Sequence, residues 1–150
     1  EQRNRVAGFV DAGRKEGAEV VCGGNAPTRP GYFFEPTVLA RTRNDMTPVK
    51  SEIFGPVLCV QTFGDDDLDS VARAANSTIY GLSGSVWTRD LGTAMKMVRK
   101  IDSGQVSVNM HAAIDPAMPF GGNKQSGWGR EFGKEGLEPY LKTKGISMTW

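Results

Sequence analysis

The stretch that decides the fold is LSGSVWTRDLGTAMKMVRKIDSGQVSVN, residues 82–109. Residues 82–88 are predicted to form a strand, and Asp90 is placed to cap the helix that follows. The apolar side chains of this helix recur at helical spacing on one face, at Leu91, Ala94, Met95, Val98 and Ile101. Gly104 ends the helix, and residues 105–109 form the next strand.

The preceding residues have the same order of strand and helix. Residues 57–63 are an apolar strand, and the three acids Asp65, Asp66 and Asp67 place negative charge at the start of a helix. The apolar face of that helix carries Leu68, Val71, Ala72 and Ala75. Strand, helix, strand, helix, strand within about 55 residues is typical of a βαβαβ sheet with helices on its faces. The sequence therefore predicts an α/β fold.

Weaker patterns occupy both ends of the chain. We expect a helix at 2–16, a strand at 18–22, an extended run at 32–40 and a short helix at 137–144. Residues 44–56 have the composition of a loop. Residues 145–150 alternate like a strand and could add to the sheet of another chain. The sequence shows no internal repeat and indicates no domain boundary.

Composition excludes several classes of protein. The chain has 150 residues, of which 39% are hydrophobic and 23% charged, and its net charge is +1. These values fit a folded domain and not a disordered segment, and no basic stripe predicts nucleic-acid binding. No apolar run approaches the ~20 residues that cross a bilayer. The two cysteines, Cys22 and Cys59, lie in apolar runs and are expected to be buried in a reducing, cytoplasmic setting. With a single histidine, the sequence predicts no metal site.

Residues 119–136 contain six of the chain's 19 glycines together with Phe120, Trp128 and Phe132. A flexible linker is one interpretation, and an ordered functional loop is favoured because aromatic residues are rare in linkers. Ligands of α/β sheets gather beyond the carboxyl ends of the strands, where the segment starting at Met110 lies. Neither a phosphate-binding loop nor a dinucleotide fingerprint is present.

Glu52 and Phe54 form the first candidate binding pair. In an extended segment, side chains two positions apart point the same way. A carboxylate beside an aromatic ring can accept hydrogen bonds from the adjacent hydroxyls of a sugar while the ring packs on a flat heterocycle. The alternative is an exposed glutamate next to a core phenylalanine, and the residues by themselves leave both open.

Several motifs occur together in a fixed order. They are EIFGPV at residues 52–57, NSTIYGL at 76–82, GQVSVN at 104–109 and PFGGNKQSGWGREFG at 119–133. GYFFEPT at 31–37 and GLEPYLKTK at 136–144 complete the set. Over essentially the whole chain this set resembles the NAD(P)-dependent aldehyde dehydrogenase superfamily, and specifically the carboxy-terminal part of its catalytic domain.

The resemblance implies roles for particular residues. Glu52 would bind the ribose next to the nicotinamide of NAD or NADP, Phe54 would pack near that ring, and Gln2 and Arg5 would reach the other ribose. Phe120 would line the tunnel for an aldehyde substrate. Met110, His111 and Ile114 belong to the variable loop, residues 110–118, that shapes the tunnel.

The family's catalytic groups have no counterpart in these 150 residues. Its cysteine nucleophile, its general-base glutamate and its Rossmann-like domain correspond to sequence upstream of residue 1. The implied reaction of the whole enzyme is thiolate attack on an aldehyde, hydride transfer and hydrolysis of the thioester to a carboxylic acid. As a fragment, the chain is expected to be inactive alone.

The resemblance also implies an assembly. Residues 1–144 would belong to the catalytic domain, and residues 145–150 would be an oligomerisation strand of a homodimer or homotetramer. The residues Asn109, His111, Asp115 and Pro116 are most similar to enzymes that act on phenylacetaldehyde and related aromatic aldehydes. The alternative is a non-catalytic homologue kept as a structural module, which a natural polypeptide of only about 16 kDa would support.

Overall fold

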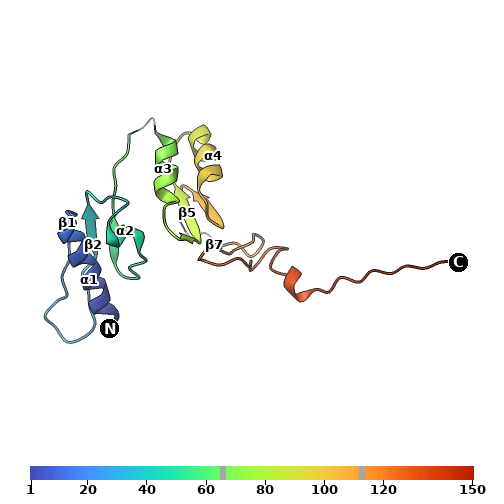
Figure 1. Cartoon of the computed structure of the whole chain (residues 1–150), viewed down its shortest axis with the longest axis horizontal. Coiled ribbons are helices and arrows are strands. Elements are labelled where there is room, and N and C mark those ends of the chain that lie inside the picture. Colours follow the sequence, from blue (N-terminus) through green and yellow to red (C-terminus); the bar gives the residue numbers. More distant parts are fainter. Residues whose placement is uncertain (65–66, 112–113) are drawn as a thin grey trace. The chain divides into compact units, whose positions relative to one another are not determined.

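Up to residue 109 the helices and strands follow the predicted order, with one additional helix and one additional two-residue strand (Figure 1). The computed structural model describes residues 1–64, 67–111 and 114–150, which form two compact units, residues 1–78 and 79–150. The first unit contains α1 (Gln2–Lys15), β1 (Glu19–Cys22), β2 (Thr37–Ala40), α2 (Thr47–Lys50), β3 (Val57–Cys59) and α3 (Leu68–Ala75). The second contains β4 (Tyr80–Gly81), β5 (Ser83–Val86), α4 (Leu91–Lys100), β6 (Gln105–Val108), β7 (Asn123–Lys124) and the 3₁₀ helix η1 (Glu138–Tyr140).

The described part of the first unit is built on a three-stranded sheet in the order β1-β2-β3. Strand β1 runs antiparallel to β2, and β3 runs parallel to β2. Helix α1 buries one face, and its Val10 joins the core cluster of Val10, Ala18, Leu39 and Met46. A Cβ atom at Gly13 would lie 3.2 Å from Leu39, so glycine lets the helix approach the sheet closely.

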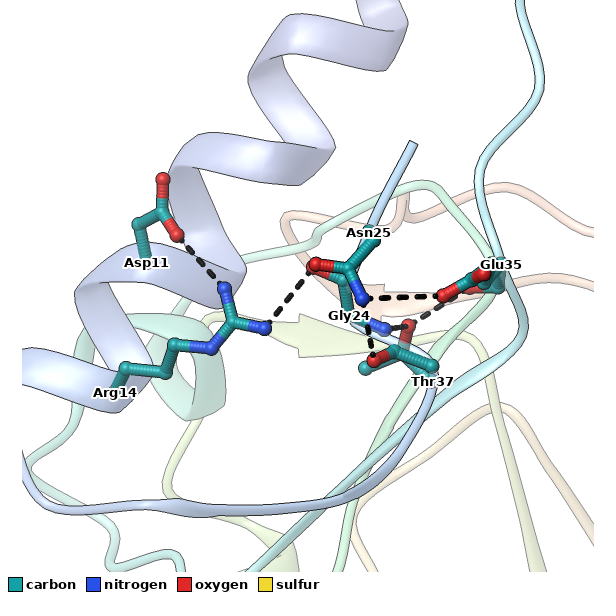
Figure 2. Close-up of polar contacts among 7 residues, drawn as sticks. Asp11, Arg14, Gly24, Asn25, Glu35 and Thr37 are labelled. Atoms are coloured by element: carbon teal, nitrogen blue, oxygen red, sulfur yellow. Dashed lines mark hydrogen bonds and ion pairs between the residues drawn. The ribbon is translucent and has the colours of Figure 1, made fainter. Parts of the chain in front are cut away.

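A polar network fixes the chain between β1 and β2, as Figure 2 shows. The Thr37 side chain is buried, and its hydroxyl accepts from the Gly24 N–H at 2.8 Å and donates to the Glu35 carbonyl at 2.7 Å. Arg14 of α1 donates to the Gly24 carbonyl at 3.1 Å and to Asp11 at 3.0 Å. The helix and the turn are therefore tied by side chains that satisfy backbone groups.

Helix α2 lies within the segment that the sequence predicts to be a loop. Its first residue, Thr47, donates its backbone N–H to the Glu16 carboxylate at 2.7 Å, and its hydroxyl donates to the same carboxylate. The hydroxyl bond and then the backbone bond lower the pKa of Glu16 below its ordinary value of 4.5. Because the capping residue lies 31 positions away, the local sequence does not predict it.

Glu16→Gln should loosen α2. Because the folded pKa of Glu16 is depressed, its stabilising effect is complete above pH 4.5 and is lost as pH falls through the folded-state pKa. The Thr47 amide resonance should titrate with a midpoint below 4.5 in the parent chain, and Glu16→Gln should abolish that titration and lower amide protection in α2. An unchanged Thr47 titration in Glu16→Gln would show that another acid caps the helix. Glu19→Gln is the control and should leave the Thr47 titration as it is in the parent chain.

The second unit contains a parallel βαβ unit, β5-α4-β6, with Val86 opposite Val108. Asp90 caps α4 by accepting from the Thr93 N–H at 2.6 Å, as predicted, and the hydrogen bonds from Thr93 lower the pKa of Asp90. Past the end of β6, Asn109 has a φ of 54°. Its side-chain amide accepts from the Thr88 N–H and donates to the Thr88 carbonyl, each at 2.9 Å.

The α/β class is confirmed, but the described strands do not share one βαβαβ sheet. Strand β3 pairs with β2, β5 pairs with β6, and β4 pairs with β7. Element order along the chain does not fix which strand edges meet, and β2 offers β3 a parallel partner. Of the acids before α3, Asp67 accepts from the Ser70 N–H as a cap, while Asp65 and Asp66 lie outside the described residues.

The carboxy-terminal elements are shorter than predicted. The helix expected at 137–144 is reduced to η1, whose chain contains Pro139 and lacks an extended apolar face. Residues 145–150 form no strand within the described chain (Figure 1). A strand requires a neighbour for its backbone N–H and C=O groups, so pairing with a second chain stays a prediction.

Candidate functional site

The four residues predicted to contact a cofactor come together in the first unit. Glu52 and Phe54 follow α2, and both are exposed, whereas Ile53 between them is 8% exposed. The Glu52 carboxylate forms no hydrogen bond or ion pair with any described residue. The carboxylate of Glu52 and the ring of Phe54 therefore face outward, and the buried side chain of Ile53 anchors the segment between them.

The backbone at Phe54 is not extended, contrary to the expectation from sequence. Its φ is 54°, in the left-handed region, which costs an L-residue roughly 1–2 kcal/mol. The outward direction of Glu52 and Phe54 therefore depends on a specific turn at Phe54 and not on simple alternation along a strand.

Side chains from the first turn of α1 bind the backbone of this segment. The Gln2 amide donates to the carbonyl of Phe54 at 2.7 Å and to that of Ile53 at 3.3 Å. The Arg5 guanidinium donates to the carbonyl of Glu52 at 3.1 Å and lies 5.6 Å from the centre of the Phe9 ring. Sequence reasoning found these two residues but not their contact with the backbone, which spans about 50 positions.

An aromatic cleft lies beside this segment. Its volume is about 510 Å³, and its lining includes Gln2, Val6, Tyr32, Phe33, Phe34 and Phe54. Arg29 stacks over Phe33, 4.0 Å from the ring centre. The cleft gives the Phe54 ring an apolar neighbourhood that a flat heterocycle could share.

In the second unit, Phe120 is half-buried and lies in the glycine-rich segment. It exchanges backbone hydrogen bonds of 2.7 Å with Glu131, which closes residues 120–131 into an ordered loop. Phe120 lines a cavity of about 360 Å³ together with Leu82, Gly121, Gly122 and Arg130. The linker interpretation of this segment is therefore wrong.

The other predicted substrate residues do not line the Phe120 cavity among the described residues. Met110, His111 and Ile114 are exposed, and residues 112–113 of the same loop lie outside the described residues. The described residues of this segment lie in no helix or strand that would direct these side chains. Their part in a substrate site stays a prediction.

The role of Arg130 in organising the loop was not predicted. Its guanidinium donates to the carbonyls of Gly122 at 2.7 Å and Gly129 at 2.9 Å, and to the Asn123 side chain at 2.8 Å. Asn123 in turn donates to Asp102 at 3.0 Å. An arginine within a run of glycines, whose carbonyls need donors, was the available clue.

The two cysteines differ in exposure. Cys22 is exposed, contrary to prediction, because it ends the short strand β1 outside the core. Cys59 is half-buried, and burial raises the pKa of its thiol, which disfavours the reactive thiolate. Both are free, and the described residues contain no cluster of acids, histidines and cysteines suited to a metal ion. No described helix is long and apolar enough to span a membrane.

Comparison with known proteins gives consistent matches. The Aldehyde dehydrogenase family model matches residues 1–146. Over 142 residues the chain is 46% identical to cytosolic 10-formyltetrahydrofolate dehydrogenase from Homo sapiens, covering 95% of this chain and 16% of that protein. Among solved structures, NAD-dependent aldehyde dehydrogenase from Sinorhizobium meliloti is 39% identical with a TM-score of 0.92, covering 99% of this chain and 29% of that one.

Betaine aldehyde dehydrogenase from Staphylococcus aureus, solved in complex with NAD⁺, is 41% identical with a TM-score of 0.88. The match covers 96% of this chain and 29% of that one. The chain therefore spans less than a third of the length of each of these proteins.

Proposed function

Because the chain belongs to the aldehyde dehydrogenase family, we propose that it supplies cofactor and substrate contacts to an enzyme that oxidises an aldehyde to a carboxylic acid. The observation that carries this proposal is the outward-facing pair Glu52 and Phe54, whose backbone is held by α1. In the enzyme, NAD⁺ or NADP⁺ would accept the hydride. The nucleophile and general base would come from residues outside this chain.

The residues present fit the nicotinamide half of the cofactor. The Glu52 carboxylate has all its acceptor positions free among the described residues, as binding of two adjacent ribose hydroxyls requires. Phe54 is 74% exposed and adjoins the aromatic cleft, so its ring is available to a flat heterocycle. Glu52 would orient the ribose, and Phe54 would limit the positions of the nicotinamide ring.

The second unit would form part of the aldehyde channel. Phe120 already lines a cavity beside the ordered loop, and Met110, His111 and Ile114 would contribute from the preceding segment. An aromatic aldehyde is the proposed substrate class, because the ring of Phe120 in the cavity wall can stack on an aromatic substrate.

Residues 1–144 would be part of the catalytic domain, and residues 145–150 would pair with a second copy in a homodimer or homotetramer. Ile146, Met148 and Trp150 are 77%, 72% and 108% exposed, at alternate positions as in a strand with one apolar face. Both cysteines are free, which is consistent with the proposed cytoplasmic location.

Glu52→Gln tests the cofactor assignment in the complete enzyme that carries this segment. A hydrogen bond to a charged group contributes about 1.5–3 kcal/mol, so cofactor affinity or hydride transfer should fall roughly 10- to 100-fold. The measurements are Kd for NAD⁺ by titration and the single-turnover rate of hydride transfer. Glu19→Gln, at an exposed glutamate on β1, is the matched control. Equal affinity and rate in Glu52→Gln and the parent enzyme would refute the assignment.

A further inference from the structure

Helix α1 binds three consecutive carbonyls of the segment that carries the candidate cofactor residues. Arg5 donates to the carbonyl of residue 52, and Gln2 donates to those of residues 53 and 54. Residues 2, 5 and 6 share one helix face because they are three and four positions apart. The third of them, Val6, is 2% exposed and packs so closely on Gly55 that a Cβ atom there would lie 2.4 Å from it.

The two Gln2 hydrogen bonds act on both peptide groups that flank Phe54. The carbonyl of Ile53 belongs to the peptide group before Phe54, and the carbonyl of Phe54 belongs to the one after it. Fixing the two peptide planes fixes φ and ψ of the residue between them. Phe54 lies in the left-handed region, which an aromatic residue does not keep without external support.

The Gln2 amide nitrogen and one guanidinium nitrogen of Arg5 donate to the backbone, while the Glu52 carboxylate and the Phe54 ring stay exposed. We infer that Gln2 and Arg5 are positioning residues that act through this backbone and aim Glu52 and Phe54 at the ribose and nicotinamide of the cofactor. This inference rests on the function proposed above and replaces direct ribose contact as the main role of the two side chains. A site that is already ordered binds its ligand more tightly than a flexible one, because less free energy is lost in ordering the site on binding.

Amide hydrogen exchange of the 150-residue chain tests the positioning itself. Gln2→Met keeps the length of the side chain and removes its donors, and Arg5→Met does the same at the second position. Exchange at the amides of residues 53–55 and of Val57, which donates to the Gly55 carbonyl, should become about tenfold faster in Gln2→Met, while the exchange of β2 stays unchanged. Arg3→Met is the matched control, because Arg3 lies on the same helix and its guanidinium donates to Gly31 instead. Equal exchange at these amides in Gln2→Met and the parent chain would overturn the inference.

A double-mutant cycle in the complete enzyme separates positioning from direct contact. Glycine adopts positive φ freely, so Phe54→Gly removes the need for support by Gln2. Gln2→Met should raise KM for NAD⁺ about tenfold in the parent enzyme and less than twofold in the Phe54→Gly background. Full additivity of the two changes would overturn the positioning role. If the parent enzyme does not bind NAD⁺, the proposed function fails by itself, and the exchange measurement still decides whether Gln2 holds the segment.

Discussion

Gly104→Ala is expected to destabilise the second unit by about 3 kcal/mol or more. A Cβ atom at this position would lie 1.7 Å from the carbonyl oxygen of Gly121 and 2.7 Å from its carbon. Both atoms are backbone, so no side-chain rotation can relieve the overlap, and either β6 or the glycine-rich loop must move. Overpacking of this kind reaches and exceeds the usual range of about 1–3 kcal/mol.

Tryptophan fluorescence is a suitable measurement, because all three tryptophans, Trp87, Trp128 and Trp150, lie in the second unit. The urea midpoint of this unit should fall markedly, and its Tm should drop by roughly 12–24 °C. Gly129→Ala is the matched control, since no atom lies within 4 Å of the Cβ that it adds. Equal midpoints for the two variants would contradict the close approach of β6 to the loop.

Arg130→Met should also destabilise the second unit, by about 2–4 kcal/mol. It removes three hydrogen bonds from a charged donor and leaves the carbonyl of the buried Gly122 without its 2.7 Å partner. Loss of this support should free residues 120–131, whose backbone carries Phe120. In the complete enzyme, KM for the aldehyde should therefore rise more than KM for NAD⁺.

Arg130→Lys is the informative control for this prediction. Lysine keeps the charge but has no planar fork with which to reach all three acceptors. We expect a urea midpoint between those of Arg130→Met and the parent chain. A midpoint for Arg130→Lys equal to that of the parent would show that charge alone, and not the set of three hydrogen bonds, stabilises the loop.

Helices α1, α3 and α4 were predictable because their evidence is local. Periodic apolar residues and the acids Asp67 and Asp90 specify α3 and α4, and both caps form. The pairing of strands was not predictable, because β4 and β7 are two-residue strands separated by more than 40 positions. Their pairing depends on contacts such as the Ser126 hydroxyl with the Gly81 N–H at 3.0 Å.

The candidate site was predictable only as a list of residues. The motif around residues 52–57 identified Glu52 and Phe54, but the left-handed turn at Phe54 comes from α1, far away in sequence. Arg130 was missed for the same reason, since its acceptors are backbone oxygens that carry no residue-type pattern. Sequence motifs therefore identified the exposed candidate groups better than the groups that hold their backbone.

At the end of the β5-β6 pair, the side chain of Asn109, and not a peptide group, forms the hydrogen bonds to the backbone of Thr88. The β5-β6 pair can therefore end at this residue, and the described residues of the segment that follows take no part in its ladder. Insertions or exchanges in that segment would leave the hydrogen bonds of the sheet intact. Such insulation leaves the segment free to diverge in evolution on an unchanged scaffold.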